Sequence, residues 1–169
     1  MIKRIIITGG PSSGKTSIIN ALKNKGYSCF DEVSREIIKE MNIKTAFKNI
    51  DFEETVFRKR KRDFLNAKSG LNFYDRSMLD NIAYLKKNKH KIPTYFKTDC
   101  ENHRYYPLVF IATPWKDIYT VDDERLESFN DSIQIFETIK QVYKEAKYNL
   151  IKIPQSTVNE RISFIINKI

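Results

Sequence analysis

A loop pattern near the start of the chain carries the clearest chemistry. Residues 9–16 read G-G-P-S-S-G-K-T and match G-x-x-x-x-G-K-[ST], the pattern of a loop that binds the phosphates of a nucleoside triphosphate. Glycines let backbone N–H groups converge on phosphate oxygens, and the helix that follows adds positive potential. We predict that Lys15 reaches the β- and γ-phosphates and that the Thr16 hydroxyl is a ligand of Mg²⁺. The residues predicted to bind the nucleotide here are Gly9, Gly10, Pro11, Ser12, Ser13, Gly14, Lys15, Thr16 and Ser17.

Two carboxylates follow apolar segments that are predicted to be strands. Glu32 lies at the end of the second segment, where it could accept the proton of an attacking hydroxyl or hold a sugar diol. The alternative for Glu32 is a carboxylate at the amino end of a helix, where the helix dipole favours it. Asp75 ends the third segment and is predicted to hold Mg²⁺ through water, while its alternative role is to cap the helix that contains Met78.

Two arginines are the predicted charge-stabilising groups. Arg76 follows Asp75 directly and is placed to neutralise charge on a phosphate or on the acceptor. Arg125 lies in the long polar connection over residues 113–130, which we predict to be a lid that closes over the phosphates and excludes water. The alternative for Arg125 is a surface residue paired with Asp122 or Glu124.

Five basic residues in a row occupy positions 58–62, in a segment predicted to be helical. Five consecutive cations wrap most of a helical turn, so some must face solvent, whereas Arg60 or Arg62 could point toward the cleft. The block is either a solvated helix face or a docking surface for an anionic acceptor or nucleic acid. Nucleic acid is the less favoured partner, because the sequence contains neither an aromatic RNA-binding motif nor a helix-turn-helix signal.

Short apolar runs alternate with longer amphipathic stretches, which is typical of an α/β fold with a parallel sheet. The predicted strands are 3–8, 27–31, 71–75, 106–112 and 149–153, and the clearest helices are 15–25, 132–147 and 157–168. Residues 32–69 are predicted to be mostly helical, with a break near 42–51, and to lie on the acceptor side. We expect one domain over residues 1–169, with three layers and helices on both faces of a five-stranded sheet.

Composition agrees with an ordinary globular domain. Of the 169 residues, 41% are hydrophobic and 30% charged, and 30 basic against 21 acidic residues give a net charge of +9. No apolar run approaches the length of about 20 residues that a membrane-spanning helix needs. The amino end lacks the layout of a signal peptide, and two cysteines cannot form a disulfide framework. These features predict a cytoplasmic protein without a transmembrane segment.

Other nucleotide-binding classes fit the sequence less well. A guanine-specific switch protein would need an Asn-Lys-x-Asp element, and neither Asn24-Lys25 nor Asn88-Lys89 is followed by that aspartate. A ring-forming ATPase would need a helical lid domain beyond the core, for which 169 residues leave no room.

The chain resembles the P-loop family of predicted ATPases and kinases that includes the ribosylnicotinamide kinase domain. Beyond the phosphate loop, the matching segments are Glu32 with 35–38, 74–76, 114–115, 122–129, and 153–154 with Val158 and Arg161. The resemblance implies a nucleoside- or nucleotide-kinase-like core with a sheet order of 2-3-1-4-5. It also implies that adenine is held near the loop after the fifth strand, at Pro154, Gln155 and Ser156.

Two functional hypotheses follow. The first is a phosphotransferase that depends on ATP and Mg²⁺ and acts on a nucleoside, a nucleotide or a similar small hydroxyl-bearing metabolite. Lys15, Glu32, Asp75, Arg76 and Arg125 are its predicted catalytic residues. The second is a nucleotide-binding ATPase or regulatory module that hydrolyses weakly and docks a partner through residues 58–62. The sequence leaves the acceptor and the oligomeric state open.

Overall fold

A computed structural model describes residues 1–41, 50–119 and 128–169 of the chain. Five parallel strands form one sheet in the order β2-β3-β1-β4-β5, which confirms the predicted α/β class and strand order. The strands are β1 (Ile2–Gly9), β2 (Ser28–Phe30), β3 (Gly70–Asp75), β4 (Leu108–Ala112) and β5 (Asn149–Ile153). Their carboxyl ends meet at one edge of the sheet, where α/β folds of this kind bind ligands.

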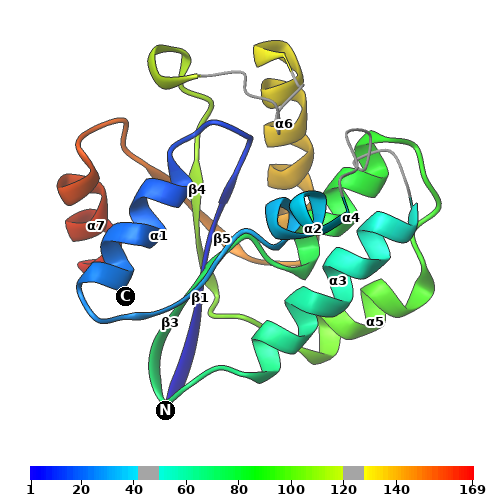
Figure 1. The fold of residues 1–169 in the computed structure, drawn as a ribbon, viewed down its shortest axis with the longest axis horizontal. Coiled ribbons are helices and arrows are strands. Elements are labelled where there is room, and N and C mark those ends of the chain that lie inside the picture. The colour runs from blue at the N-terminus through cyan, green and yellow to red at the C-terminus, as the bar shows by residue number, and fades with distance from the viewer. Residues whose placement is uncertain (42–49, 120–127) are drawn as a thin grey trace.

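Helices cover both faces of the sheet, as Figure 1 shows. The helices are α1 (Lys15–Asn24), α2 (Val33–Met41), α3 (Ile50–Leu65), α4 (Met78–Lys87), α5 (Thr94–Asn102), α6 (Phe129–Glu145) and α7 (Val158–Ile166). Helices α1 and α7 share one apolar core with the sheet, and α3 to α6 share the other. The predicted break near residues 42–51 falls mostly on residues 42–49, which lie outside the described residues.

The apolar run in β1 follows from its central place in the sheet. Ile5 and Ile7 pack against α1 and α7, while Ile6 between them packs into the core beneath α4 and α6. All three side chains are fully buried. A strand that is covered on both faces reads as a continuous hydrophobic run rather than an alternating one.

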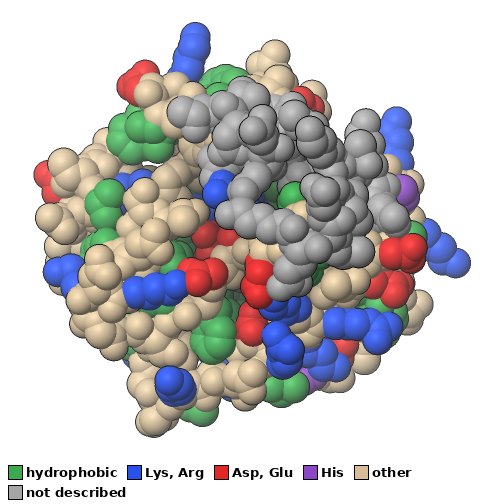
Figure 2. All heavy atoms as spheres, viewed as in Figure 1, with side chains coloured by type: hydrophobic (Ala, Val, Ile, Leu, Met, Phe, Trp, Pro, Cys, Tyr) green, Lys and Arg blue, Asp and Glu red, His purple; other side chains and the backbone are tan. Residues whose placement is uncertain are grey.

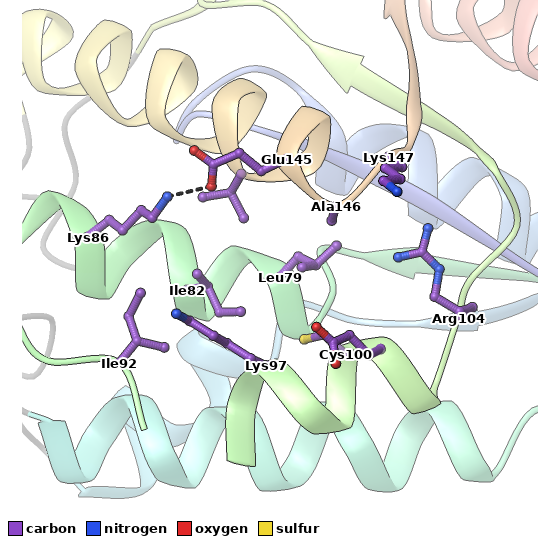
Figure 3. Close-up of a pocket in the computed structure, with 12 residues that line it drawn as sticks. Leu79, Ile82, Lys86, Ile92, Lys97, Cys100, Arg104, Glu145, Ala146 and Lys147 are labelled. Carbon is purple, nitrogen blue, oxygen red and sulfur yellow. Dashed lines mark hydrogen bonds and ion pairs between the residues drawn. The ribbon is translucent and has the colours of Figure 1, made fainter. Parts of the chain in front are cut away.

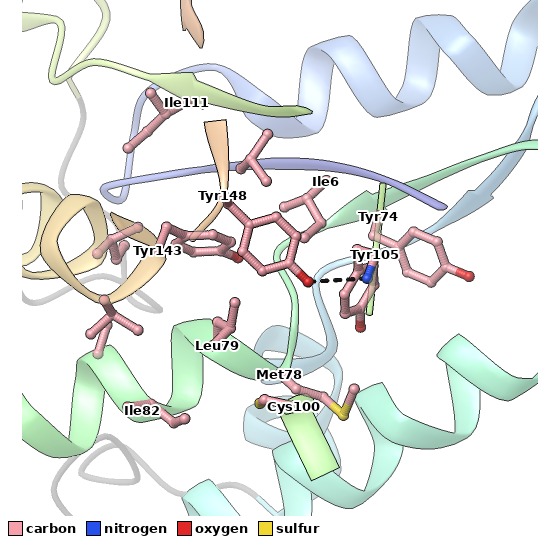
Figure 4. Close-up of a cluster of buried hydrophobic side chains, with 14 of the residues drawn as sticks. Ile6, Tyr74, Met78, Leu79, Ile82, Cys100, Tyr105, Ile111, Tyr143 and Tyr148 are labelled. Carbon is pink, nitrogen blue, oxygen red and sulfur yellow. Dashed lines mark hydrogen bonds between the residues drawn. The ribbon is translucent and has the colours of Figure 1, made fainter. Parts of the chain in front are cut away.

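Aromatic side chains fill the core on the α3–α6 side. The rings of Phe57 and Phe96 stack with centroids 3.7 Å apart, which joins α3 to α5. Figure 4 shows the deeper part of this core, where the backbone N–H of Tyr105 donates to the Tyr148 hydroxyl (3.1 Å). Large rings therefore hold the helices of this layer against the sheet.

Across the described ranges 1–41, 50–119 and 128–169, no helix combines the length and apolar character that crossing a bilayer requires.

Removing the Leu22 side chain is expected to destabilise the α1 layer. Leu22 is fully buried against the sheet, so Leu22→Ala should lower the free energy of unfolding by about 2–5 kcal/mol. Asn20→Ala, on the exposed face of the same helix, should change it by less than about 0.5 kcal/mol. Urea denaturation of the three proteins measures the difference. Equal stability of the two variants would show that α1 does not pack as described.

Candidate active site

The phosphate loop runs from the end of β1 to the start of α1 and is shaped by close backbone approaches. A Cβ atom at Gly9 would lie 2.2 Å from the Ala112 carbonyl oxygen of the neighbouring strand β4, so only glycine fits. Gly14 has a left-handed backbone (φ 77°), and a Cβ there would lie 2.6 Å from Nη1 of Arg161. Within the described residues, no side chain caps the amino end of α1, so its first N–H groups are available to an anion.

Lys15 lies along this loop with its ammonium group buried. Its Nζ donates to the Gly10 carbonyl oxygen (2.7 Å) and to the Ser13 hydroxyl (3.2 Å). Burial, followed by repulsion from Arg76, lowers the pKa of Lys15 to about 8. The ammonium is therefore largely protonated at neutral pH, and Lys15 is among the residues that line a cavity over this loop. Its contact with phosphates stays a prediction.

A cavity of about 400 Å³ lies over the phosphate loop. Its floor is formed by residues 12–17, which include the exposed hydroxyls of Thr16 and Ser17. Its walls come from Trp115 and Ile118 after β4 and from residues 156–158 after β5. The volume falls within the range of small-ligand sites.

Arg161 on α7 supports the loop from the side of this cavity. Its Nη2 donates to the Ser13 carbonyl oxygen (3.0 Å), and its guanidinium lies 5.8 Å from the centre of the Trp115 ring. The side chain is almost fully buried. Arg161 is not among the predicted site residues. It lies on an otherwise apolar helix face, and its partner Ser13 is close only in the folded chain, where α7 packs beside the phosphate loop.

Of the three predicted adenine-side residues, Pro154 and Gln155 lie outside the lining of the cavity. Pro154 and Gln155 are both exposed, and the Gln155 amide donates to the Thr113 hydroxyl (3.2 Å) and the Pro114 carbonyl oxygen (3.1 Å). Gln155 thus ties the loops after β4 and β5 together, whereas Ser156 lines the cavity.

A buried cluster of charged groups lies beside the phosphate loop, at the carboxyl ends of β2 and β3. Glu32 accepts from Nε of Arg76 through one oxygen and from Nη2 of Arg60 (2.7 Å) through the other. Nη1 of Arg76 donates to the Gly9 carbonyl oxygen (2.9 Å). Burial alone would raise the pKa of Glu32, but Arg76 and Arg60 lower it to about 2, so Glu32 is a carboxylate at neutral pH.

The amino end of α4 holds both arginines of this cluster through hydrogen bonds. Asp80 accepts from Nη1 of Arg76 (3.2 Å) and from the Tyr143 hydroxyl of α6 (2.6 Å). The Asn81 carbonyl oxygen accepts from Nη1 of Arg60 (2.8 Å), and the Asn81 amide donates to the Glu53 carboxylate (2.7 Å). Each arginine is therefore held by the Glu32 carboxylate, from the segment between β2 and α2, and by a polar group from α4.

Asp75 ends β3 as predicted, but its alternative role as a helix cap is wrong. The cap of α4 is Ser77, whose hydroxyl accepts from the Leu79 N–H (3.1 Å) in a capping box completed by Asp80. The Oδ1 atom of Asp75 is buried and has no hydrogen-bond partner among the described residues. Burial, together with repulsion from Glu32, raises the pKa of Asp75 to about 6.

The residues present fit a Mg²⁺ site that a bound nucleotide would complete. The unpartnered carboxylate oxygen of Asp75 and the exposed Thr16 hydroxyl are oxygen ligands of the kind that this ion prefers. In the described part of the chain, no three His, Cys, Asp or Glu side chains gather as a self-sufficient metal site.

The predicted lid is described only at its two ends. Trp115, directly before the short helix η2 (Lys116–Ile118), and Ile118, its last residue, line the cavity over the phosphate loop. Arg125 lies outside the described residues, so its predicted role remains a prediction.

The five basic residues at positions 58–62 of α3 do not all face the same way. Arg60 points inward to Glu32, while Lys59 pairs with Glu36 (2.5 Å) and Lys61 with Asp99 (2.6 Å). Figure 2 shows acidic and basic side chains interspersed on this side of the molecule instead of one continuous basic surface. The inward direction of Arg60 confirms one of the two orientations that the sequence leaves open, and Arg62 is exposed.

Removing the Arg60 guanidinium is expected to destabilise the protein strongly. Arg60→Met takes one of two cations from the buried Glu32 carboxylate, so the free energy of unfolding should fall by about 3–5 kcal/mol. Arg58→Met, on the exposed side of the same helix, should change it by less than about 0.5 kcal/mol. Urea denaturation compares the two variants, and a small effect of Arg60→Met would contradict the buried pairing.

Glu53 is expected to make stability depend on pH. Burial raises its pKa from 4.5 to about 7, although Arg60 and Asn81 partly offset this, so the folded state binds the proton more tightly than the unfolded state. The resulting stabilisation is complete below about pH 4.5 and is lost as the pH rises through 7. Relative to Glu53→Gln, the wild type should lose on the order of 3 kcal/mol between pH 4.5 and pH 8.

Urea denaturation of both proteins across this pH range checks the difference. Asp75 also titrates there, but it is present in both proteins, so its effect cancels. Parallel pH profiles for the two proteins would count against a protonated, buried Glu53.

Solved structures with the same fold include several kinases. A deoxyadenosine kinase from M. mycoides with bound dATP superimposes with a TM-score of 0.70 at 19% identity, over 98% of each chain. The NadR protein in complex with NR gives a TM-score of 0.74 at 17% identity, over 98% of this chain and 49% of that one. A thymidylate kinase from Ehrlichia chaffeensis gives 0.59 at 15% identity, over 98% of each chain. These similarities confirm the fold.

No curated protein matches the sequence. Residues 4–161 match a protein family that is described as an AAA domain. Because this match spans nearly the whole chain and includes the phosphate loop, the protein belongs to that family of P-loop domains.

Proposed function

We propose that the protein is a kinase-type phosphotransferase that moves a phosphoryl group from ATP to a hydroxyl of a nucleoside, a nucleotide or a similar small metabolite. The observation that carries this proposal is the position of Arg76, which contacts both the Gly9 carbonyl of the phosphate loop and the Glu32 carboxylate. A single guanidinium thus links the predicted donor site to the predicted acceptor site.

The structural neighbours support the same reaction type. Kinases of deoxyadenosine and of thymidylate share this sheet and its helices over almost the full chain. One of them was solved with dATP, and a NadR structure contains AMP-PNP, so related folds bind adenine nucleotides. We extend to this chain only the reaction class and the nucleotide, because the identities are below 20%.

Each residue has a role that its geometry allows. Lys15 would neutralise charge on the transferred phosphoryl group, and the N–H groups at the start of α1 would hold the other phosphate oxygens. Arg76 would stabilise negative charge that spreads toward the acceptor during transfer. Arg125 would add a further positive charge, if the lid brings it to the phosphates.

Glu32 would orient the acceptor hydroxyl by accepting its hydrogen bond. Because the pKa of Glu32 is lowered to about 2, this carboxylate is a weak base and is poorly matched to removing a proton early. Phosphoryl transfer through a loose transition state needs little early proton removal, so orientation of the hydroxyl is the larger contribution.

Thr16 and Asp75 would hold Mg²⁺ together with the nucleotide. When bound, this ion would neutralise charge on the phosphates of ATP. Asp75 must be deprotonated for this role, and its raised pKa of about 6 means that it is largely ionised at neutral pH.

The test is ADP release from Mg·ATP with and without a panel of nucleosides, nucleotides and nicotinamide riboside. We expect turnover to rise sharply with one class of acceptor. Lys15→Ala should lower that turnover by at least about 100-fold, since it removes a charge from the transferred group. Lys25→Ala, at the exposed end of α1, is the matched control and should stay within about twofold of wild type.

Slow hydrolysis that no acceptor stimulates would overturn the kinase proposal and favour the nucleotide-binding regulatory module instead. Full activity of Lys15→Ala would contradict the assigned phosphate site itself. Circular dichroism of the variant separates lost chemistry from lost folding.

A further inference from the structure

A second cavity, of about 470 Å³, lies between α4, α5 and α6, away from the phosphate loop. It shares no lining residue with the cavity over that loop, within the part of the chain that the structure describes. Its volume falls in the range of about 300–1,000 Å³ that small-molecule sites occupy. No residue assigned above to phosphoryl transfer lines it.

The cavity has an apolar middle and charged ends, as Figure 3 shows. Leu79 and Ile82 of α4 and Ala146 after α6 line the middle. Lys86 and Lys97 lie at one end, and Arg104 and Lys147 lie at the other. The lining therefore suits a molecule with an apolar body and a polar group at an end.

The two ends differ in how their charges are balanced. At the first end, Lys86 pairs with Glu145 at 2.6 Å. At the other end, neither Arg104 nor Lys147 has a described carboxylate within ion-pair distance. Four basic side chains and the carboxylates of Glu101 and Glu145 line the cavity, so its lining carries an excess of positive charge. Lys97 at the first end likewise has no described carboxylate within ion-pair distance.

Arg104 is held in place before any ligand binds. Its guanidinium lies over the Tyr148 ring, 4.0 Å from the ring centre. Tyr148 is itself buried, and its hydroxyl accepts from the Tyr105 N–H. A planar guanidinium fixed on a buried ring loses little freedom when it binds an anion, and it suits a two-oxygen anionic group.

We propose that this cavity is a binding site for a small organic anion that has an apolar body and one terminal carboxylate or phosphate. The body would contact Leu79 and Ile82, and the anionic group would lie between Arg104 and Lys147. This site is separate from phosphoryl transfer and does not depend on the function proposed above.

Isothermal titration calorimetry with 1-naphthylacetate tests the site, with 1-naphthylacetamide as an uncharged analogue of nearly the same shape. We expect the acid to bind at least about fivefold more tightly than the amide, since only the acid forms charge-assisted hydrogen bonds. Excess Mg·ATP should leave this binding unchanged, because the two cavities share no lining residue. A titration with 1-naphthyl phosphate in excess Mg·ATP, which would occupy the phosphate loop, then shows whether a phosphate or a carboxylate is preferred.

Two variants remove the cations with little risk to folding. Lys147 has a left-handed backbone (φ 61°), a conformation that favours glycine, so Lys147→Gly removes the ammonium and relieves backbone strain. Arg104→Gln removes the other charge. Each should weaken binding of 1-naphthylacetate by about fivefold or more and leave binding of the amide within about twofold.

Matched controls exist for both changes. Lys89 also has a left-handed backbone (φ 57°) and follows a helix, but it lies outside the cavity, so Lys89→Gly should bind like wild type. Arg58→Gln, on the exposed side of α3, is the control for Arg104→Gln.

Three results would overturn the proposal. The first is equal binding of acid and amide, and the second is no binding of either at millimolar concentration. The third is a dimer, seen by sedimentation, that Arg104→Gln converts to monomer, because the cavity would then be a contact between two copies of the chain.

Discussion

The buried guanidinium of Arg76 is the interaction on which the site depends. Its side chain reaches from the end of β3 to the Gly9 carbonyl, to Glu32 and to Asp80, and so joins three parts of the chain. Its backbone is left-handed (φ 76°), which costs a residue with a side chain on the order of 1 kcal/mol. The backbone N–H of Arg76 donates to the Ile7 carbonyl oxygen (3.0 Å), so the sheet holds the residue in this conformation.

So many charged groups can be buried together only because groups of opposite charge pair with one another. Glu32 has two guanidinium partners and stays ionised, whereas Glu53 has an amide as its direct partner and tends toward the neutral form. Asp75, beside them, has a buried oxygen without a described partner. In this shared environment the three carboxyl groups therefore differ in their tendency to ionise, because the number and charge of their partners differ.

Sequence reasoning succeeded where the signal is local and failed where it depends on partners far along the chain. The phosphate loop and the strand that ends at Asp75 were predictable, because spacing alone encodes a strand, a tight loop and a helix. Arg60 lies in a run of five similar cations, and only the packing of α3 against α4 shows which one faces Glu32. The role of Arg161 was equally hard to predict, because Ser13, whose carbonyl oxygen it contacts, lies 148 positions earlier in the chain.

The central place of β1 in the sheet has a consequence for synthesis of the chain. β1 is made before both of its neighbours, which begin at Gly70 and at Leu108, so its two edges lack partners until those later segments have left the ribosome. Pairings of this kind across long stretches of sequence form slowly. A nascent chain that ends before β4 already contains the whole phosphate-binding sequence, but it has no Ala112 carbonyl beside Gly9. The phosphate loop thus reaches its final shape only after β4 has been made, although its own residues are translated about 100 positions earlier.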